Sequence, residues 1–443
     1  MSRKLNVLFL VVDDLRPQLG CYGRSQMHTP HIDGLADRGV VFERAYCQVP
    51  VCGATRASLL SGVRPTRRRF VDYKTWLDHD LPGALTLPQY FRDHGYRTHA
   101  CGKVFHHLPD TAERSWCEMP FMPDCEGTWR NYLLPENLKS DVSEDRRGPA
   151  YEKADVPDNA YRDGQIADRA VAELSRLSGQ EEPFFLAAGF VKPHLPFNAP
   201  AKYWDLYRHD DVPLAGNAFR PQDAPDEAMH NWGELRKYFD IPAEGPVPDE
   251  MARNLVHGYY AATSYTDAQV GRVLAQLDAI GLRESTIVVL WGDHGWQLGE
   301  HGMWCKHCNF HTSLNAPLIV SAPGVPGGRR ARGLVEFLDV YPTLCELAGL
   351  PRSEHLDGAS LTPLLTDPAR PGKPAVFSRY FAGDSIRTDR YLYTEWADDT
   401  GEQTARMLYD HDRDPAENVN LAERDESRDT VADLSRRLAA LRP

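Results

Sequence analysis

Short apolar runs alternate with amphipathic stretches along most of this chain of 443 residues. Residues 5–12, 183–191 and 285–291 are apolar at almost every position, which is typical of strands buried on both faces of a parallel sheet. Residues 163–177 and 251–280 instead place their apolar side chains at helical spacing. The alternation predicts an α/β fold in which a large mixed, mostly parallel sheet is sandwiched by helices.

The last part of the chain has a different pattern. Residues 367–374 are rich in Pro and Gly and predict a linker. Beyond it, short strand-like runs between residues 375 and 396 precede an amphipathic helix close to the last residue. We therefore expect a larger domain over residues 1–368 and a smaller α+β subdomain, an antiparallel sheet plus a helix, over residues 369–443.

Charge and composition exclude some classes of partner. The formal net charge of −13 argues against general binding to nucleic acid or to an anionic membrane surface. No apolar run reaches the roughly 18 residues of a membrane span, so we expect no membrane association. Residues 5–12 are too short for a signal peptide and lead straight into two aspartates. The sequence therefore predicts a cytoplasmic protein, or a periplasmic or secreted one if a leader was removed.

Residues 52–62, with the sequence CGATRASLLSG, contain the candidate nucleophile. They read as a turn that feeds the first turn of a helix, so backbone N–H groups would point at Cys52. A helix N-terminus binds anions and lowers the pKa of a thiol, and Arg56 adds a positive charge. We expect an electropositive site around Cys52; the alternative is a small buried cysteine at a helix start.

Acidic residues follow two of the predicted buried strands. Asp13 and Asp14 come directly after residues 5–12, and Asp293 with His294 comes after residues 285–291. Open α/β sheets bind their ligands at the carboxyl ends of the strands, where these side chains can meet. The alternative for Asp13 and Asp14 is the capping of a following helix.

Lysine and histidine side chains follow other predicted strands. Lys103 and His106 come after a strand at residues 97–101, where they can bind an anionic oxygen and exchange a proton. His194 lies between two prolines that fix its backbone, as a general acid requires, although a structural histidine in a turn is the alternative.

Lys306 lies between Cys305 and Cys308, a pair with the spacing of redox or zinc motifs. Because no second cysteine pair is near, Lys306 is favoured as the functional residue. The basic run at residues 64–69 forms either a solvated face or a surface that steers an anion toward Cys52.

Two Pro-rich, acidic stretches show no periodic pattern. Residues 107–165 are expected to cross the mouth of the site and to carry specificity. Residues 208–250 indicate little about mechanism.

Cys52-Gly53-Ala54-Thr55-Arg56, followed by ASLLSG, resembles the signature of the type I sulfatases of the alkaline phosphatase superfamily, although the commoner form has Pro at position 54. The strand that ends in Asp13-Asp14 and the Gly102-Lys103 pair resemble the same family. The resemblance implies a hydrolase of sulfate esters in which a formylglycine-generating enzyme oxidises Cys52 to formylglycine (3-oxoalanine), and it implies that residues 1–368 are the catalytic domain.

The resemblance also implies the roles of the candidate residues. Asp13, Asp14, Asp293 and residue 52 would bind Ca²⁺, with Mg²⁺ as the second choice, and His294 stands where many members have Asn. Arg56, Lys103 and Lys306 would neutralise the sulfate oxygens, and His194 or His106 would protonate the departing oxygen.

Within the family, residues 86–91 (TLPQYF), 102–106 (GKVFH), 192–197 (KPHLPF) and 293–302 (DHGWQLGEHG) resemble the iduronate-2-sulfatase group. This implies a sulfated sugar as the substrate, such as a uronate 2-O-sulfate. The alternatives are a phosphodiester or phosphonate monoester hydrolase on the same scaffold and a glycan-binding protein without catalysis.

Overall fold

The computed structural model describes residues 4–125 and 127–443, and its core is a sheet of seven strands. In spatial order the strands are β11 (Arg329–Glu336), β2 (Val40–Tyr46), β10 (Leu318–Ser321), β7 (Thr286–Gly292), β1 (Asn6–Val12), β5 (Phe184–Phe190) and β3 (Arg97–Gly102). β10 runs antiparallel to both neighbours, and the other pairs are parallel. The predicted mixed, mostly parallel sheet is confirmed.

β1 lies in the middle of this sheet, and every one of its residues is buried. It pairs in parallel with β5 on one side and β7 on the other, and Val12 is the partner of Gly292. Because the carboxyl ends of these strands share one edge, the residues that follow them are held close together.

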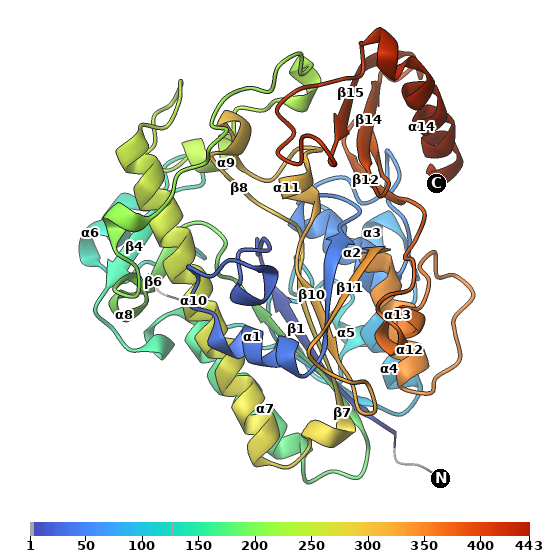
Figure 1. Ribbon diagram of the computed structural model, residues 1–443. Helices are drawn as coiled ribbons and strands as arrows, with labels where there is room; N and C mark the ends of the chain where they lie inside the picture. The colour runs from blue at the N-terminus through green and yellow to red at the C-terminus, as the bar shows by residue number, and fades with distance from the viewer. Residues whose placement is uncertain (1–3, 126) are drawn as a thin grey trace.

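Helices cover both faces of the sheet (Figure 1). One face packs against α1 (Pro30–Asp37), α7 (Arg162–Leu177) and the long α10 (Asp249–Ala279). The other face packs against α2 (Cys52–Ser61), α4 (Leu87–Asp93), α12 (Val340–Leu347) and α13 (Thr362–Thr366). Each face therefore has its own hydrophobic core, as the apolar strand runs require.

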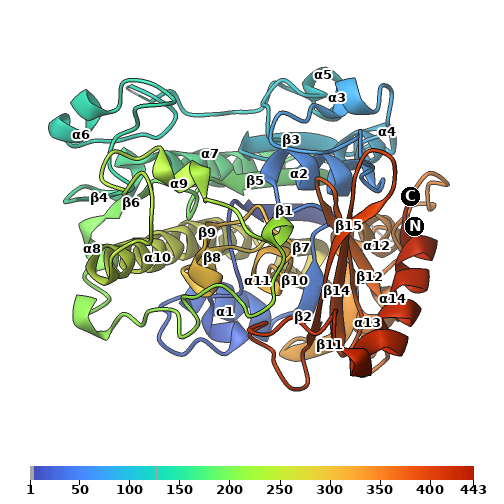
Figure 2. The ribbon, with the colours of Figure 1, turned by 90° about the horizontal axis from the view of Figure 1, so that it is seen from above.

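The C-terminal part forms an antiparallel sheet with the order β12 (Val376–Tyr380), β13 (Gly383–Arg387), β14 (Tyr391–Ala397) and β15 (Gln403–Asp410). Helix α14 (Arg428–Leu441) packs on its outer face in both views and buries Val431, Leu434 and Leu438 (Figures 1 and 2). The predicted sheet-plus-helix arrangement is confirmed. The boundary at residues 368 and 369 stays a prediction.

Shorter helices and strands lie outside the two large sheets. They are α3 (Leu77–Asp80), α5 (Ala112–Ser115), α6 (Pro135–Ser140), β4 (Tyr151–Ala154), β6 (Phe197–Pro200), α8 (Ala201–Trp204), α9 (Gly233–Arg236), β8 (Gln297–Leu298), β9 (Trp304–Cys305) and α11 (His311–Leu314). Among the described residues, none of the helices combines the length and the apolar character that a bilayer crossing needs.

Candidate functional site

Three carboxylates meet at the carboxyl edge of the large sheet. Asp13 and Asp14 follow β1, Asp293 follows β7, and all three are fully buried. The backbone N–H of Asp14 donates to Oδ1 of Asp293 at 3.0 Å. Asp14 has a φ of 56°, which is uncommon for a residue other than glycine and is often found at functional sites. The structure thus brings together residues that are 279 positions apart in sequence.

Cys52 is the first residue of α2, and its side chain faces these acids. Its Sγ lies 3.9 Å from Oδ1 of Asp14 and 3.4 Å from Nε2 of His294. The ligand atoms of Asp13, Asp14, Cys52 and His194 lie within 4.8 Å of one another, and so do those of Cys52, Asp293 and His294. Residues from four separate segments therefore form one buried cluster.

The expectation of an electropositive, low-pKa thiol at Cys52 is wrong. Burial, followed by the charge of Asp13, raises the pKa of Cys52 well above its ordinary value. The helix N-terminus and the nearby lysines do not outweigh the desolvation of the thiolate and the neighbouring carboxylates. The unmodified thiol is therefore protonated and a weak nucleophile.

Arg56 is fully buried behind the acids. Its Nη2 lies 3.0 Å from Oδ1 of Asp13, and its Nε lies 2.9 Å from Oδ2 of Asp293. Its Nη1 donates to the backbone carbonyls of Lys103 and Val104. All three of its nitrogens thus contact protein acceptors, and the side chain bridges Asp13 and Asp293.

Two lysines flank the cluster on different sides. Lys103 donates from Nζ to Asp13, and Asp13 is the charge that most opposes desolvation of this lysine. Nζ of Lys306 lies 3.2 Å from Oδ1 of Asp14 and 4.8 Å from the ring centroid of Trp296, a cation–π contact. Both ammonium groups therefore border the space between Asp13, Asp14 and Cys52.

The imidazole of His194 is held from both sides. Its Nδ1 lies 2.6 Å from the carbonyl oxygen of Leu195, and its Nε2 lies 3.1 Å from Oε1 of Glu234. Both nitrogens face acceptors, which favours protonation of the ring. Burial, followed by the charge of Lys306, nevertheless lowers the pKa of His194 below its ordinary value, although Glu234 and Asp13 oppose the shift.

Glu234 is a site residue that the sequence reasoning missed. It lies on α9, within residues 208–250, a stretch whose sequence indicated little about mechanism. Its Oε2 lies 2.8 Å from Nζ of Lys306, and its Oε1 reaches His194. A lone glutamate in an aperiodic loop gives no pattern that sequence reasoning can detect.

His106 lies beside Lys103 but outside the carboxylate cluster. Its Nδ1 is buried and has no hydrogen-bond partner among the described residues. Burial and the charge of Lys103 lower the pKa of His106 well below its ordinary value. The ring is therefore neutral at neutral pH and has a nitrogen free to accept a proton.

The charges and lone pairs of the cluster fit a divalent cation. Nδ1 of His294 lies 2.9 Å from the carbonyl oxygen of Gly295, so in the neutral ring Nδ1 carries the hydrogen and Nε2 presents its lone pair. That Nε2 lies 3.4 Å from Oδ1 of Asp14 and 3.6 Å from Oδ1 of Asp293, acceptors that repel it. A cation between these atoms removes the repulsion.

The balance of ionised groups points the same way. With Asp14 ionised, the acids Asp13, Asp14, Asp293 and Glu234 outnumber Arg56, Lys103 and Lys306 by one, and burial raises the pKa of Asp14 to about 7. An anionic ester would be repelled by this excess, whereas one divalent cation reverses its sign.

The cysteine pair around Lys306 shows no sign of redox or zinc chemistry. Cys305 and Cys308 are free thiols in the described part of the chain, and both are buried. Burial raises the pKa of each. The interpretation that Lys306, not the pair, is functional is consistent with its place beside Asp14.

Comparison with known proteins identifies the family. A sequence model of the sulfatase family matches residues 5–350, and a model described as N-sulphoglucosamine sulphohydrolase, C-terminal, matches residues 299–443. The chain is 33% identical to iduronate 2-sulfatase of Homo sapiens over 501 aligned residues, covering 94% of this chain and 91% of the relative. The resemblances found in the sequence are confirmed.

Solved structures agree with this result. A structure described as a 2-O GAG sulfatase is 26% identical, with a TM-score of 0.69 over 99% of this chain and 92% of the other. Phosphonate monoester hydrolase from Silicibacter pomeroyi has a TM-score of 0.80 at 23% identity over 99% of this chain and 95% of the other, and this likeness shows the fold alone. The chain belongs to the sulfatase family and is a hydrolase of sulfate esters.

Proposed function

We propose that the protein cleaves a sulfate ester on a sulfated sugar, using an oxidised residue 52 and a bound calcium ion. The observation that carries this proposal is the convergence of Asp13, Asp14 and Asp293 on Cys52. Carboxylate oxygens in this number suit Ca²⁺, with Mg²⁺ as the second choice. These residues and His294 would hold the ion, which supplies positive charge to the sulfate oxygens.

The raised pKa of Cys52 supports its modification. A protonated, buried thiol is a poor nucleophile, so the residue needs a different functional group to attack sulfur. A formylglycine-generating enzyme would convert it to formylglycine, whose hydrated aldehyde supplies the hydroxyl nucleophile. The position at the start of α2 aims this group at the space between the acids.

The cationic side chains have two different tasks in this proposal. Lys103 and Lys306 border the open space beside Cys52, and each would bind a sulfate oxygen as the substrate displaces part of its contact with an aspartate. Arg56 has its nitrogens on protein acceptors, so it would act by orienting Asp13 and Asp293. Fixed charges of this kind stabilise the transition state without reorganisation.

The two histidines are suited to opposite proton transfers. His194, with acceptors at both nitrogens, would give a proton to the departing sugar oxygen. His106 is neutral and has an unpartnered Nδ1 among the described residues, so it would accept a proton when sulfate is released. The depressed pKa of His194 favours release of its proton to the leaving group.

The likeness to iduronate 2-sulfatase and to a 2-O GAG sulfatase supports a sulfated glycan as the substrate, with a uronate 2-O-sulfate as the first candidate. The test is a panel of defined sulfated mono- and disaccharides, with peptide mass spectrometry of residue 52 in the same preparation. Release of sulfate from at least one sugar, together with a formyl group at residue 52, would support the proposal. An unmodified thiol in fully active protein would contradict it.

The variant Cys52→Ser tests the nucleophile separately. The sulfate ester formed on serine has no second hydroxyl on Cβ whose deprotonation could expel sulfate. The variant should therefore stop after one turnover, and its intact mass should increase by one sulfo group (SO3). Sustained turnover by Cys52→Ser would refute the scheme.

A phosphodiester or phosphonate monoester hydrolase is the second candidate, favoured by the fold of the Silicibacter pomeroyi enzyme. A cationic metal pocket also fits phosphoryl groups. Rates on an aryl sulfate and an aryl phosphodiester, measured side by side, separate the two. A higher kcat/KM on the phosphodiester would favour the second candidate.

A further inference from the structure

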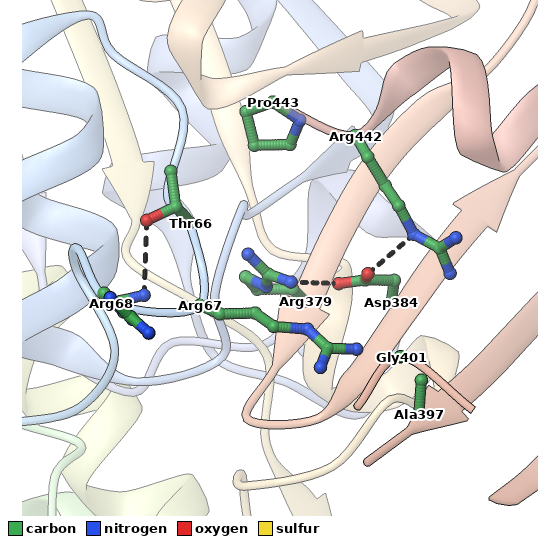
Figure 3. A pocket seen from close by; sticks show the side chains of 9 residues that line it. All are labelled: Thr66, Arg67, Arg68, Arg379, Asp384, Ala397, Gly401, Arg442 and Pro443. Atoms are coloured by element: carbon green, nitrogen blue, oxygen red, sulfur yellow. Dashed lines mark hydrogen bonds and ion pairs between the residues drawn. The ribbon is translucent and has the colours of Figure 1, made fainter. Parts of the chain in front are cut away.

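An arginine-rich pocket lies between the loop after α2 and the C-terminal sheet. It has a volume of about 420 Å³ and is lined by Thr66, Arg67, Arg68, Arg379, Asp384, Ala397, Gly401, Arg442 and Pro443. Figure 3 shows Arg379 and Arg442 reaching Asp384 from two sides while Arg67 extends toward them from the loop. Two guanidinium groups thus hold the carboxylate of Asp384, and Arg67 and Arg68 add two more to the lining of the pocket.

The positive charge of this pocket is only partly balanced. Nη2 of Arg379 donates to Oδ1 of Asp384 at 2.7 Å, and Nε of Arg442 donates to its Oδ2 at 2.8 Å. Arg442 also reaches Glu395, at 2.8 Å. Arg67 and Arg68 have no carboxylate within 4.0 Å among the described residues, and Arg67 donates only to the carbonyl oxygen of Asp398.

Arg379 supplies an unsatisfied donor inside the pocket. The residue is only 5% exposed, and its Nε has no hydrogen-bond partner among the described residues. Burial lowers the pKa of Arg379, and the neighbouring charges of Arg67 and Arg442 lower it further, against the opposing effect of Asp384. A buried donor without a partner is costly, and an oxyanion would supply both the acceptor and the charge.

The chain segments that line the pocket also lead to residues near the active site. The backbone N–H of Arg379 donates to the carbonyl oxygen of Gln48, in the segment that leads to Cys52. The ring of Tyr380 lies 6.0 Å from that of His307, next to Lys306. On the other wall, the loop that carries Arg67 continues to Tyr73. Tyr73 packs so closely on Gly53, the neighbour of Cys52, that a Cβ atom added at Gly53 would lie 2.8 Å from the carbonyl oxygen of Tyr73.

We propose that this pocket binds a second acidic group, a sulfate or a carboxylate, of the sugar chain whose ester is cleaved at residue 52. The inference rests on the proposed glycan substrate and narrows it to an oligosaccharide with more than one anionic group. Guanidinium pairs bind carboxylate and sulfate oxygens through parallel hydrogen bonds, which a neutral or single sugar would not use.

A double variant, Arg67→Gln with Arg68→Gln, tests the pocket without disturbing the core, because both residues are exposed. The matched control is Arg330→Gln with Arg370→Gln. These residues line a second arginine-rich hollow, about 480 Å³ in volume, where β11 begins, and the change in net charge is the same. All three proteins would carry Cys52→Ala, so that binding is measured without turnover. The probes are a heparin-derived tetrasaccharide and inorganic sulfate, by calorimetry.

We expect the pocket variant to bind the tetrasaccharide about tenfold or more weakly than the parent, and the control pair to match the parent within about twofold. Inorganic sulfate should bind the parent and the control pair alike, and any loss of its affinity in the pocket variant should accompany the loss for the tetrasaccharide. Equal tetrasaccharide affinity in the pocket variant and the parent, or an equal loss in the control pair, would overturn the proposal. If the pocket variant loses affinity for inorganic sulfate but not for the tetrasaccharide, the pocket is a site for free anions, and this result would also overturn the proposal.

Kinetics separates this inference from the proposed function. In proteins with Cys52 intact, the pocket variant should raise KM for the cleaved oligosaccharide about tenfold and leave kcat unchanged, because the lost contact is made equally in the ground and transition states. The kcat/KM for a monosulfated monosaccharide should change by less than about twofold. If no sulfated sugar of any length is cleaved, the proposed function fails, whereas normal cleavage with an unchanged KM in the variant refutes only the pocket.

Discussion

Replacement of Glu234 by glutamine is the sharpest test of the proton donor. The carboxylate of Glu234 lies 3.1 Å from Nε2 of His194 and 2.8 Å from Nζ of Lys306. Glutamine keeps the shape of the side chain and can still accept a hydrogen bond, but it removes the negative charge. The change therefore isolates the electrostatic effect of Glu234 on the imidazole.

The size of the effect follows from the loss of one charged hydrogen bond. Such a bond stabilises the imidazolium by about 1.5–3 kcal/mol in a buried site. At about 1.4 kcal/mol for each pKa unit, the pKa of His194 should fall by about one to two units. Because Glu234 raises this pKa in the folded protein, its removal makes His194 lose its proton at a lower pH.

The assay is the pH profile of kcat/KM on the best sulfated sugar. In the wild-type protein the limb on the alkaline side reports loss of the acid, and in Glu234→Gln this limb should move to lower pH by about one to two units. At pH values below the alkaline limb of each profile, kcat/KM of the two proteins should differ by less than about threefold. The thermal midpoint should be recorded for each protein, so that partial unfolding is recognised.

The matched control is Glu227→Gln, an exposed glutamate in the same stretch of the chain. It removes the same charge at a distance from His194, so its profile should coincide with that of the wild type. A profile of Glu234→Gln that also coincides with the wild type would refute the role of this glutamate. A uniform loss at every pH would indicate that Glu234 acts on Lys306 and not on the proton of His194.

The remaining predictions concern the metal, the arginine and the cysteine pair. Burial raises the pKa of Asp14 to about 7, so its contribution to the stability of metal-free protein is complete below the ordinary value near 3.8 and is lost as the pH rises toward 7. Chelation should therefore lower the thermal midpoint more at about pH 8 than at about pH 5.5, and added Ca²⁺ should restore it; equal midpoints at both pH values with and without Ca²⁺ would contradict this. Arg56→Lys should weaken Ca²⁺ binding by about 10–100-fold in calorimetry, because Arg56 orients two of the carboxylates, and unchanged affinity would argue against that role. Cys305→Ser should retain activity within about twofold, and a complete loss would reopen the redox interpretation.

The sequence was a good guide to the fold because most of its strands are buried on both faces. The continuous apolar runs of β1, β5 and β7 predicted the strands at the centre of the sheet. β2 and β11 were not predicted, because each carries charged residues such as Glu43 and Arg330 on partly exposed positions. An interrupted pattern of this kind does not differ from that of a loop.

The candidate site was predictable where strand ends and motifs coincide. Asp13 and Asp293 follow adjacent strands, so topology alone brings them together. The error at Cys52 has a different cause. A helix N-terminus is a local signal, whereas the pKa of the thiol depends on burial and on carboxylates that arrive from other segments. Glu234 was not predicted for the same reason, since its contacts with His194 and Lys306 exist only in the folded structure.

The buried charges of the site are not explained by the stability of the fold. Ion pairs such as Arg56 with Asp13 are fully removed from water, and apolar residues of similar volume often stabilise a core as well or better. Breaking one such pair leaves a lone buried charge at a cost of about 3–5 kcal/mol, so the network persists only as a complete set. Asp14, with its φ of 56°, adds backbone strain of about 1–3 kcal/mol to the same place. A buried network of this kind is accounted for by its use, and its carboxylates and its two bordering lysines would jointly bind a cation and an anionic ester.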